Sequence, residues 1–157
     1  MKLSEELGLR TEFHSLHHEA LLSVYHTASR IKRRADDFLS AHGLTDVQFN
    51  LMLLIFYQAG NNGGLTQVEL SRMMLVNRAN ITSLIDRMER AQLVKRTAMP
   101  GDRRCNVIQL TPRGRRLIAA AEGDYAREVT RIMGALKKPE LRALIQGLER
   151  IRERLGD

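Results

Sequence analysis

Apolar residues recur at helical spacing through the first third of the chain. Residues 11–41 contain neither proline nor glycine, and their apolar positions lie mostly three or four residues apart, which predicts one long amphipathic helix. Gly43 closes this stretch, because glycine readily takes the left-handed conformation found at helix ends. From Thr45 to about Gln58 the chain is apolar on most sides, which predicts a helix at the centre of the core.

Two capping-box patterns, each a threonine followed three residues later by Gln or Glu, mark helix starts at Thr45 and Thr66. The helix that begins at Thr66 is expected to reach about Met74, with Leu70 and Met73 facing inward. A short break separates it from the next helix, for which Asn77 is the expected N-cap.

The helix from Asn77 to about Gln92 has one apolar stripe. Four of its residues fall at positions i, i+3, i+4 and i+7 and are expected to be buried, namely Ile81, Leu84, Ile85 and Met88. Together with the helix before it, this segment predicts a helix-turn-helix.

Strand periodicity replaces helical periodicity after Gln92. Residues 93–98 and 105–110 each read as a strand, and Pro100-Gly101-Asp102 gives a turn signal between them. This region therefore predicts a β-hairpin.

Two helices complete the chain. Thr111 followed by Pro112 gives an N-cap with proline at the first helical position, and this helix is expected to reach about Leu136. Pro139 begins the last helix, which runs to about Leu155. The fold class is thus mainly α with a small β-hairpin wing. The inward-facing residues are expected to be Leu117, Ile118, Ala121, Tyr125, Val129 and Ile132 in the first helix, and Leu141, Leu144, Ile145, Leu148, Ile151 and Leu155 in the second.

Composition narrows the class of protein. The chain has 157 residues, of which 43% are hydrophobic, enough for a packed core. No apolar run is long enough to span a bilayer, and the acids near the N-terminus do not fit a signal peptide, so a cytoplasmic location with no membrane partner is expected. The single cysteine, Cys105, cannot form an internal disulfide.

The positive charge is concentrated in the middle of the chain. The net charge is +7, and the segment from Arg72 to Arg116 holds eleven basic and three acidic residues, a net of +8. The remainder holds fourteen basic and fifteen acidic residues. Such concentration indicates a polyanionic partner, most often nucleic acid; a basic face kept for solubility is the alternative.

The helix from Asn77 has the composition of a DNA-reading helix. In a helix-turn-helix the second helix enters the major groove and its first residues reach base edges. The front half offers short polar groups and one long base, and the back half and the following strand offer cations for phosphates. The expected base contacts are Arg78, Asn80, Thr82 and Ser83, and the expected phosphate contacts are Arg87, Arg90 and Arg96. Asn77, the expected N-cap, is counted among the DNA-binding residues as well.

Asp86 is out of place on a helix that faces phosphates. We expect it to pair with Arg90 four residues on, or with an arginine of the hairpin. At the hairpin tip, Arg103 and Arg104 can enter a narrow minor groove, where negative potential is concentrated, with Asp102 holding Arg104 in one direction. An exposed turn with incidental charges is the alternative reading of the tip.

These residues resemble the MarR family of bacterial regulators. The resemblance rests on the stretch from Leu65 to Arg96, on the hairpin pattern Asp102-x-Arg104, and on Leu110-Thr111-x-x-Gly114. It implies a winged helix-turn-helix that acts as a homodimer, reads a palindromic double-stranded DNA operator, and most often represses transcription.

The resemblance also suggests a division of the chain. Residues 1–43 would be an N-terminal dimerisation helix, residues 44–116 the winged helix-turn-helix lobe, and residues 117–157 the C-terminal dimerisation helices. The dimer has a physical basis as well, because the first and last helices carry more apolar surface than one short lobe needs.

Family members are often released from DNA by a small anionic or phenolic ligand, which would bind between the dimer arm and the lobe. A pocket for it is expected from residues placed near that junction, namely Arg10, His14, His18, Tyr25, Phe49 and Met52. No tryptophan is present, which argues against the urate-responsive branch of the family.

Other sensing chemistries have weaker support. No cysteine lies in the first helix, and Cys105 in the wing strand is expected to be structural, although the arginines before it could lower its pKa. His14, His17 and His18 can share a helix face and could bind a metal together with Glu12, Glu19 or a residue of a second chain. No cysteines support such a site, so no metal or other cofactor is expected. A metal- or redox-responsive regulator of the same fold stays an alternative.

Two other function classes were weighed. A non-specific architectural DNA-binding protein would use the same basic segment without reading bases; the short polar side chains of the reading helix disfavour it. An enzyme is not expected, because the chain has no glycine-rich phosphate loop, no paired carboxylates in a cleft-like context and no nucleophile motif.

Overall fold

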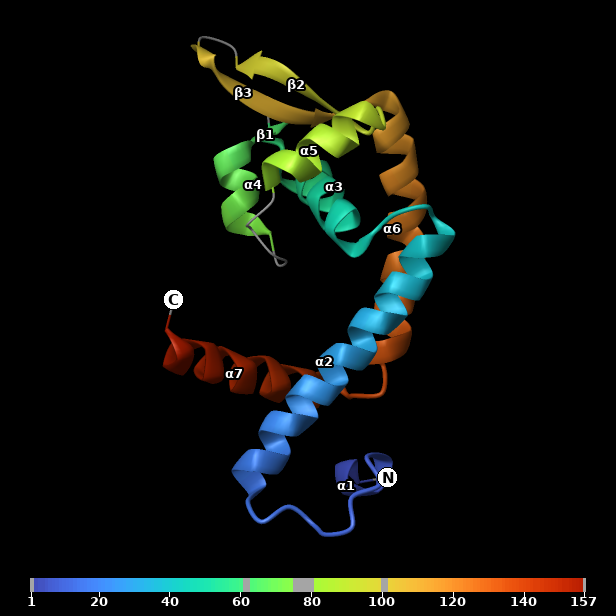
Figure 1. The fold of residues 1–157 in the computed structure, drawn as a ribbon, viewed down its shortest axis with the longest axis vertical. Coiled ribbons are helices and arrows are strands. Elements are labelled where there is room, and N and C mark those ends of the chain that lie inside the picture. The colour runs from blue at the N-terminus through green and yellow to red at the C-terminus, as the bar shows by residue number, and fades with distance from the viewer. Residues whose placement is uncertain (1, 61–62, 75–80, 100–101, 157) are drawn as a thin grey trace.

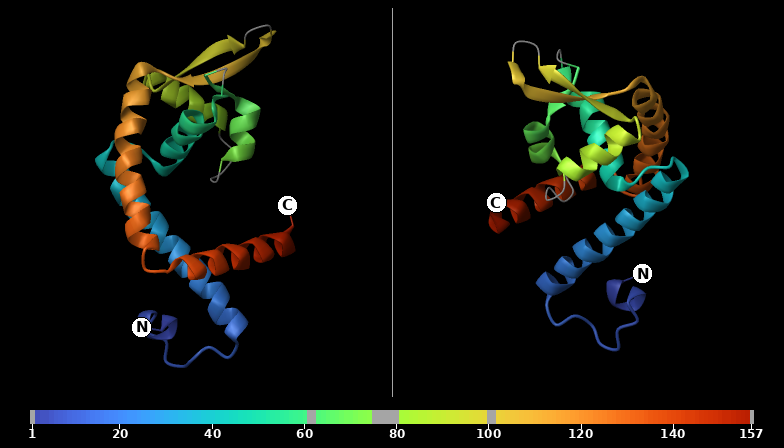
Figure 2. Two further views of the ribbon diagram at one scale, coloured as in Figure 1. Left: turned by 180° about the vertical axis from the view of Figure 1, so that it is seen from behind. Right: turned by 45° about the horizontal axis from the view of Figure 1, so that its top comes forward.

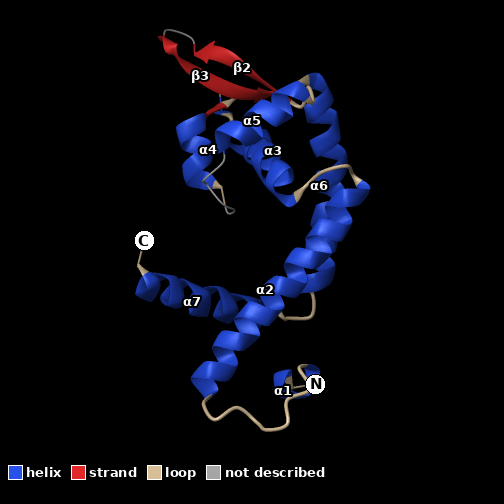
Figure 3. Cartoon of the chain, in the orientation of Figure 1, coloured by secondary structure: helices blue, strands red, loops and turns tan. Residues whose placement is uncertain are grey.

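A small lobe of helices and strands sits at one end of the molecule, and long helices extend away from it (Figures 1 and 3). The structure is a computed structural model that describes residues 2–60, 63–74, 81–99 and 102–156, with only the backbone course given for Met99 and residues 102–105. The elements are α1 (Leu3–Glu6), α2 (Leu16–Ala41), α3 (Asp46–Gln58), β1 (Leu65–Thr66), α4 (Gln67–Met73), α5 (Ile81–Arg90), β2 (Val94–Met99), β3 (Asp102–Leu110), α6 (Pro112–Met133) and α7 (Lys138–Leu155).

The lobe is built from α3, α4, α5 and an antiparallel sheet with the strand order β1-β3-β2. α3 lies at its centre and packs against α6, β3, α2 and α4. As its nearly uniform apolar sequence predicts, both sides of α3 contribute to the core. The largest fully buried side chains of the lobe include Leu51, Met52, Ile55, Leu70, Ile85, Met88 and Ile108.

The long helices form an arm. α6 leaves the sheet and runs beside the C-terminal half of α2, as the front and rear views show (Figures 1 and 2). α7 crosses α2 near the end of α6 that is remote from the sheet (Figure 1). α1 lies beside α2 at the end of the molecule opposite the sheet (Figure 1). No residue of α7 is buried. Within the described part of the chain, no helix is both long and apolar enough to cross a membrane.

Local signals predicted most of the elements. Both capping boxes are present: the Thr45 hydroxyl accepts from the Gln48 amide at 3.3 Å, and the Thr66 hydroxyl accepts from the Glu69 amide at 3.2 Å. The predicted hairpin is confirmed, with β2 and β3 paired along their lengths. The N-cap at Thr111 is confirmed as well, because its hydroxyl accepts from the Gly114 amide at 3.0 Å.

The first long helix begins later than expected. The prediction placed its start near Thr11, whereas α2 starts at Leu16, because the Ser15 hydroxyl accepts a hydrogen bond from the His17 amide at 3.2 Å and caps the helix there. A separate short helix, α1, precedes it and was not predicted. Strand β1 was also missed, because a two-residue strand has no periodicity of its own.

Several predicted inward positions prove to be exposed in this chain. Met73 is 41% exposed, and Met74 is buried in its place. The cause is the end of α4 at Met73: Met74 takes an extended conformation with ψ of 129°, which directs its side chain to the core. Val129 on α6 and the α7 stripe are also largely exposed, with Ile145 at 54% and Ile151 at 50%.

Candidate nucleic-acid interface

α5 presents a polar face because its apolar face is anchored in the lobe. Ile81, Leu84, Ile85 and Met88 are all buried, as their spacing predicts. The opposite face is exposed and contains four residues with DNA-binding chemistry, namely Thr82, Ser83, Arg87 and Arg90. Packing alone therefore turns two short hydroxyl groups and two guanidinium groups toward solvent.

The two helices of the helix-turn-helix are joined by a polar contact. The Gln67 amide nitrogen, at the start of α4, donates to the Thr82 hydroxyl on α5 at 2.6 Å. Among the described residues, Arg87 Nε and Arg90 Nε donate to backbone oxygens of their own helix, each at 3.3 Å. Both arginines are exposed, so a phosphate can approach them.

Arg96 connects the wing to α5. Its guanidinium forms ion pairs with the carboxylates of Asp86 and Glu89, and its backbone amide donates to Glu89 at 3.0 Å. The hydrogen bond to Asp86, followed by that to Glu89, raises the pKa of Arg96 above its ordinary value. Of the two partners expected for Asp86, the hairpin arginine is confirmed. The described hydrogen bond of Arg90 goes to the backbone oxygen of Asp86 and not to its carboxylate.

Several predicted DNA contacts are not described. Asn77, Arg78 and Asn80 lie outside the described residues. Asp102, Arg103 and Arg104 belong to the start of β3, where only the backbone course is given, and the same holds for Cys105. The hairpin that carries this tip projects from the lobe beyond α5 (Figures 1 and 3).

The base of the wing is fixed to the start of α6. The Thr111 hydroxyl donates to the Gln92 carbonyl at 2.6 Å, and the Thr111 amide donates to the Leu93 carbonyl at 3.1 Å. Gly114 lies so close to Leu93 that a Cβ at this position would collide with the Leu93 carbonyl oxygen. The start of α6 is therefore in direct contact with the junction between α5 and β2.

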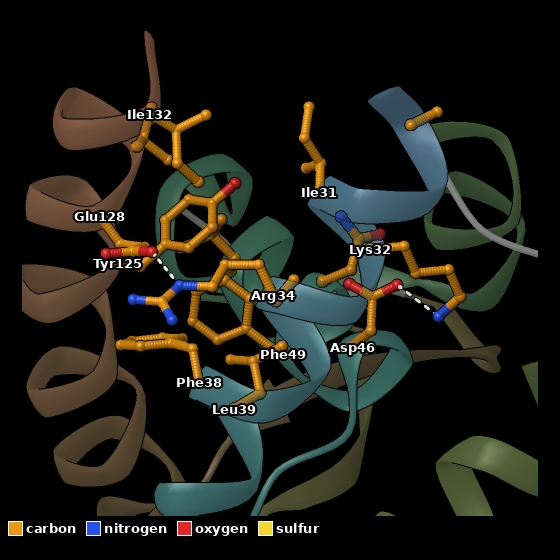
Figure 4. Close-up of a pocket in the computed structure, with 15 residues that line it drawn as sticks. Ile31, Lys32, Arg34, Phe38, Leu39, Asp46, Phe49, Tyr125, Glu128 and Ile132 are labelled. Atoms are coloured by element: carbon orange, nitrogen blue, oxygen red, sulfur yellow. Dashed lines mark hydrogen bonds and ion pairs between the residues drawn. The ribbon is translucent and has the colours of Figure 1, made fainter. Parts of the chain in front are cut away.

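A cavity of about 590 Å³ opens where the arm meets the lobe (Figure 4). Its wall is mainly apolar and aromatic, and the rings of Phe49 and Tyr125 lie 4.9 Å apart between centroids. Residues from α2, α3 and α6 line it, among them Ile31, Arg34, Phe38, Phe49, Tyr125, Glu128, Val129 and Ile132.

Of the six residues expected to form this pocket, only Phe49 lines it. Arg10 and His14 lie before α2 begins, His18 and Tyr25 are exposed on its N-terminal half, and Met52 is completely buried. The cavity faces the C-terminal half of α2, so it shares only Phe49 with the expected pocket, and ligand binding by the other five residues stays a prediction. The inward stripe of α6 was the signal that could have identified Tyr125, Val129 and Ile132.

Two ion pairs border the cavity, as the dashed lines in Figure 4 mark. Arg34 Nε lies 2.6 Å from Glu128 Oε1, and Lys32 Nζ lies 3.9 Å from Asp46 Oδ2. Hydrogen bonds from Arg131 and then Arg34 lower the pKa of Glu128 to about 2. Glu128 therefore stays ionised at neutral pH and holds Arg34 at the rim of an otherwise apolar cavity.

The histidines of the N-terminal region are not gathered with other ligands. His14, His17 and His18 are all exposed. Among the residues that the structure describes, no three or more His, Cys, Asp and Glu side chains are grouped so that they could hold a metal ion.

Known proteins resemble both the lobe and the whole fold. Residues 44–106 match the model of the MarR family. The HTH-type transcriptional regulator MhqR of Bacillus subtilis (strain 168) is 26% identical over 137 residues, which are 85% of this chain and 92% of MhqR.

Solved structures extend the similarity over the arm. AbsC, a MarR family transcriptional regulator from Streptomyces coelicolor, matches with a TM-score of 0.78 at 21% identity, covering 92% of this chain and 98% of AbsC. The regulator MOSR of M. tuberculosis, solved in complex with DNA, matches with a TM-score of 0.65 at 26% identity, covering 87% of this chain and 97% of MOSR.

Proposed function

We propose that this chain, a transcriptional regulator of the MarR family, binds an inverted-repeat DNA operator as a homodimer and acts mainly as a repressor. A small anionic or phenolic ligand would release it from DNA. The members of the family are regulators and not enzymes. The observation that carries the proposal is the exposed face of α5. This face displays Thr82, Ser83, Arg87 and Arg90 on a helix whose other side is fixed in the core.

Base reading is assigned to the front of this helix and phosphate binding to its back. Thr82 and Ser83 are short enough for the helix backbone to approach base edges, with Asn77, Arg78 and Asn80 proposed to extend the contact. Arg87 and Arg90 would hold the phosphates. Arg103 and Arg104 of the wing tip, with Asp102 orienting Arg104, would probe the minor groove. MOSR is itself solved with DNA, which supports this use of the fold.

Arg96 takes a different role from the one its sequence position suggested. Its guanidinium is already engaged by Asp86 and Glu89, so we do not assign it to a phosphate.

The arm supports the proposed homodimer. Large apolar side chains remain exposed on both long elements that leave the lobe, including Leu16 at 78% and Leu21 at 53% on α2, and Ile145 at 54% and Leu155 at 77% on α7. Exposed apolar side chains in this number favour an interface with another chain. A second copy would cover it, and two-fold symmetry would then place the two α5 helices on successive turns of DNA. The division into residues 1–43, 44–116 and 117–157 follows from this assignment.

The cavity beside Tyr125 supports the proposed release by a ligand. It is apolar, lies between arm and lobe, and has Arg34 at its rim to meet an anionic or phenolic group. A ligand there would contact α6, whose first turn is tied to the α5–β2 junction by Thr111.

Selection of bound duplexes from a random-sequence DNA library tests the proposal. We expect the selected pool to contain an inverted repeat whose half-site centres lie about one helical turn apart. A pool without any preferred sequence would contradict base reading and would favour an architectural DNA-binding protein.

A further inference from the structure

The wing and the recognition helix share a small charged cluster, formed by Arg96, Asp86 and Glu89. Arg96 lies on β2, and the two acids lie one helical turn apart on α5. Three contacts join them: the guanidinium pairs with each carboxylate, and the Arg96 amide donates to Glu89 Oε1 at 3.0 Å. Glu89 thus accepts from both the side chain and the backbone of the same wing residue.

Only an arginine has the shape for this position. Its planar guanidinium offers nitrogens in several directions and can contact two carboxylates at once, whereas the ammonium of a lysine acts as one compact charge. The Arg96 side chain is 28% exposed, less than Asp86 at 47% and Glu89 at 38%. The cluster is therefore only partly screened by water.

The placement of this cluster bears on how DNA is read. The recognition helix and the wing are proposed to enter different grooves, so their relative position must fit the spacing of those grooves. Strand β1 pairs with Val107 and Ile108 of β3, and Val94 is buried in the core, so the lobe already holds the inner part of the hairpin. The cluster adds a direct link between β2 and α5 at Arg96, which lies opposite Ile108 in the sheet.

We propose that Arg96 is a positioning residue for DNA recognition: held by Asp86 and Glu89, it fixes the wing against α5 so that both reach their grooves together. This inference rests on the proposed function, and it deepens that function by assigning operator selectivity to a residue that does not touch DNA.

The acids offer a test that separates positioning from electrostatics. Replacing both carboxylates, in the double variant D86N/E89Q, removes two negative charges from the DNA-facing side of the lobe and releases Arg96. If Arg96 contacts a phosphate, or if charge alone decides, the variant binds all DNA more tightly. If the cluster positions the wing, the variant loses affinity for the selected duplex by roughly tenfold, while its affinity for a random duplex is unchanged or rises.

The experiment compares wild type, D86N/E89Q and R96K on two probes, a duplex selected from a random library and a scrambled duplex of the same composition, at one fixed salt concentration. Hydroxyl-radical footprinting of the selected duplex gives a second readout. Protection of the minor groove at the wing should weaken in the variants, while the major-groove contacts of α5 persist. E149Q/E153Q, which replaces two exposed carboxylates on α7, serves as the control for the loss of two negative charges.

Each outcome decides the question. Loss of selectivity with a weakened wing footprint supports the inference, and unchanged selectivity or tighter binding to both probes overturns it. Should D86N/E89Q fail to fold, R96K decides alone: it keeps the charge, so selectivity equal to wild type overturns the inference and reduced selectivity supports it. A wild-type protein without any preferred duplex would overturn the proposed function and this inference together, and a selective wild type with equally selective variants overturns the inference only.

Discussion

Arg34 on α2 and Glu128 on α6 join the two long helices of the arm, although they lie 94 positions apart in the chain. Arg34 Nε is 2.6 Å from Glu128 Oε1, and Glu128 also accepts from Arg131 of its own helix. The Glu128 side chain is only 17% exposed. The pair therefore fixes α2 against α6 at the mouth of the cavity, where a ligand would have to enter.

The Glu128 carboxylate should make stability depend on pH in a definite range. Its pKa is about 2, against an ordinary value of 4.5, so the folded protein gains stability from the ionised form above pH 4.5 and loses that gain as the pH falls toward 2. We expect E128Q to be less stable than wild type at pH 7, with the difference closing as the pH falls through this range. Urea unfolding at several pH values measures it.

Glu6 and Glu69 also have lowered pKa values, so they too make stability depend on pH. The stability of E128Q must therefore be compared with that of wild type at each pH. Glu153→Gln, at an exposed position near the end of α7, is the control. A stability difference between E128Q and wild type that stays constant from pH 7 to pH 2.5 would contradict the role assigned to Glu128.

Arg87→Ala should weaken binding to operator and random DNA alike. Arg87 is exposed, and its described hydrogen bond is a long one to a backbone oxygen, which suits a phosphate contact. Loss of one such contact should reduce the slope of log affinity against log salt by about one per chain. Fluorescence anisotropy titrations at several salt concentrations test this. If only operator binding suffers, Arg87 is a base reader.

Arg104→Ala should weaken operator binding strongly and leave the protein dimeric. The expectation comes from the sequence of the wing tip, where Asp102 precedes an arginine that fits a narrow minor groove. The expected loss is about 1–3 kcal/mol per half-site. Gel-shift titration gives the affinity and sedimentation gives the assembly; an unchanged affinity would remove the wing tip from the interface.

Local signals explain why the helices around the DNA-binding face were predictable. The Thr66 capping box and the stripe from Ile81 to Met88 each lie within one element, and both are confirmed. The pairing of Asp86 with a hairpin arginine was one of two options, because a helix followed directly by a strand leaves few partners within reach. The choice between Arg90 and Arg96 required the actual course of the strand.

The cavity could not be predicted in the same way. Arg34, Phe49 and Tyr125 come from three helices, α2, α3 and α6, and tertiary packing, not a local signal, decides which half of α2 lies beside α6. The absence of proline and glycine from residues 11–41 also did not fix the start of α2 at Leu16, which the Ser15 cap determines. The cavity and the expected pocket consequently share only Phe49.

Gly114→Ala should destabilise the protein, because the new Cβ would collide with the Leu93 carbonyl oxygen and displace α6 from the lobe. Overpacking of this kind typically costs about 1–3 kcal/mol. Gly123→Ala, further along the same helix, meets only the end of the Arg127 side chain at 3.9 Å and should stabilise by about 0.5–1 kcal/mol. Equal effects of the two substitutions in urea unfolding would show that the α6 contact is unimportant.

A charge on the apolar side of α7 should weaken the dimer. Ile145 and Ile151 are about half exposed in one chain, and a second copy is proposed to cover them. The double variant I145E/I151E should therefore shift toward the monomer in sedimentation velocity at micromolar concentration. The neighbouring polar substitution Gln146→Glu should leave the assembly intact. A variant as dimeric as wild type would exclude α7 from the interface.

The most direct measurement of the account as a whole is a competition titration at fixed salt, with a labelled inverted-repeat duplex obtained by selection and two unlabelled competitors, the same duplex and a scrambled one. We predict that two chains bind each labelled duplex and that the scrambled competitor displaces them only at about a thousandfold higher concentration. Equal displacement by both competitors, or binding of a single chain per duplex, would contradict it.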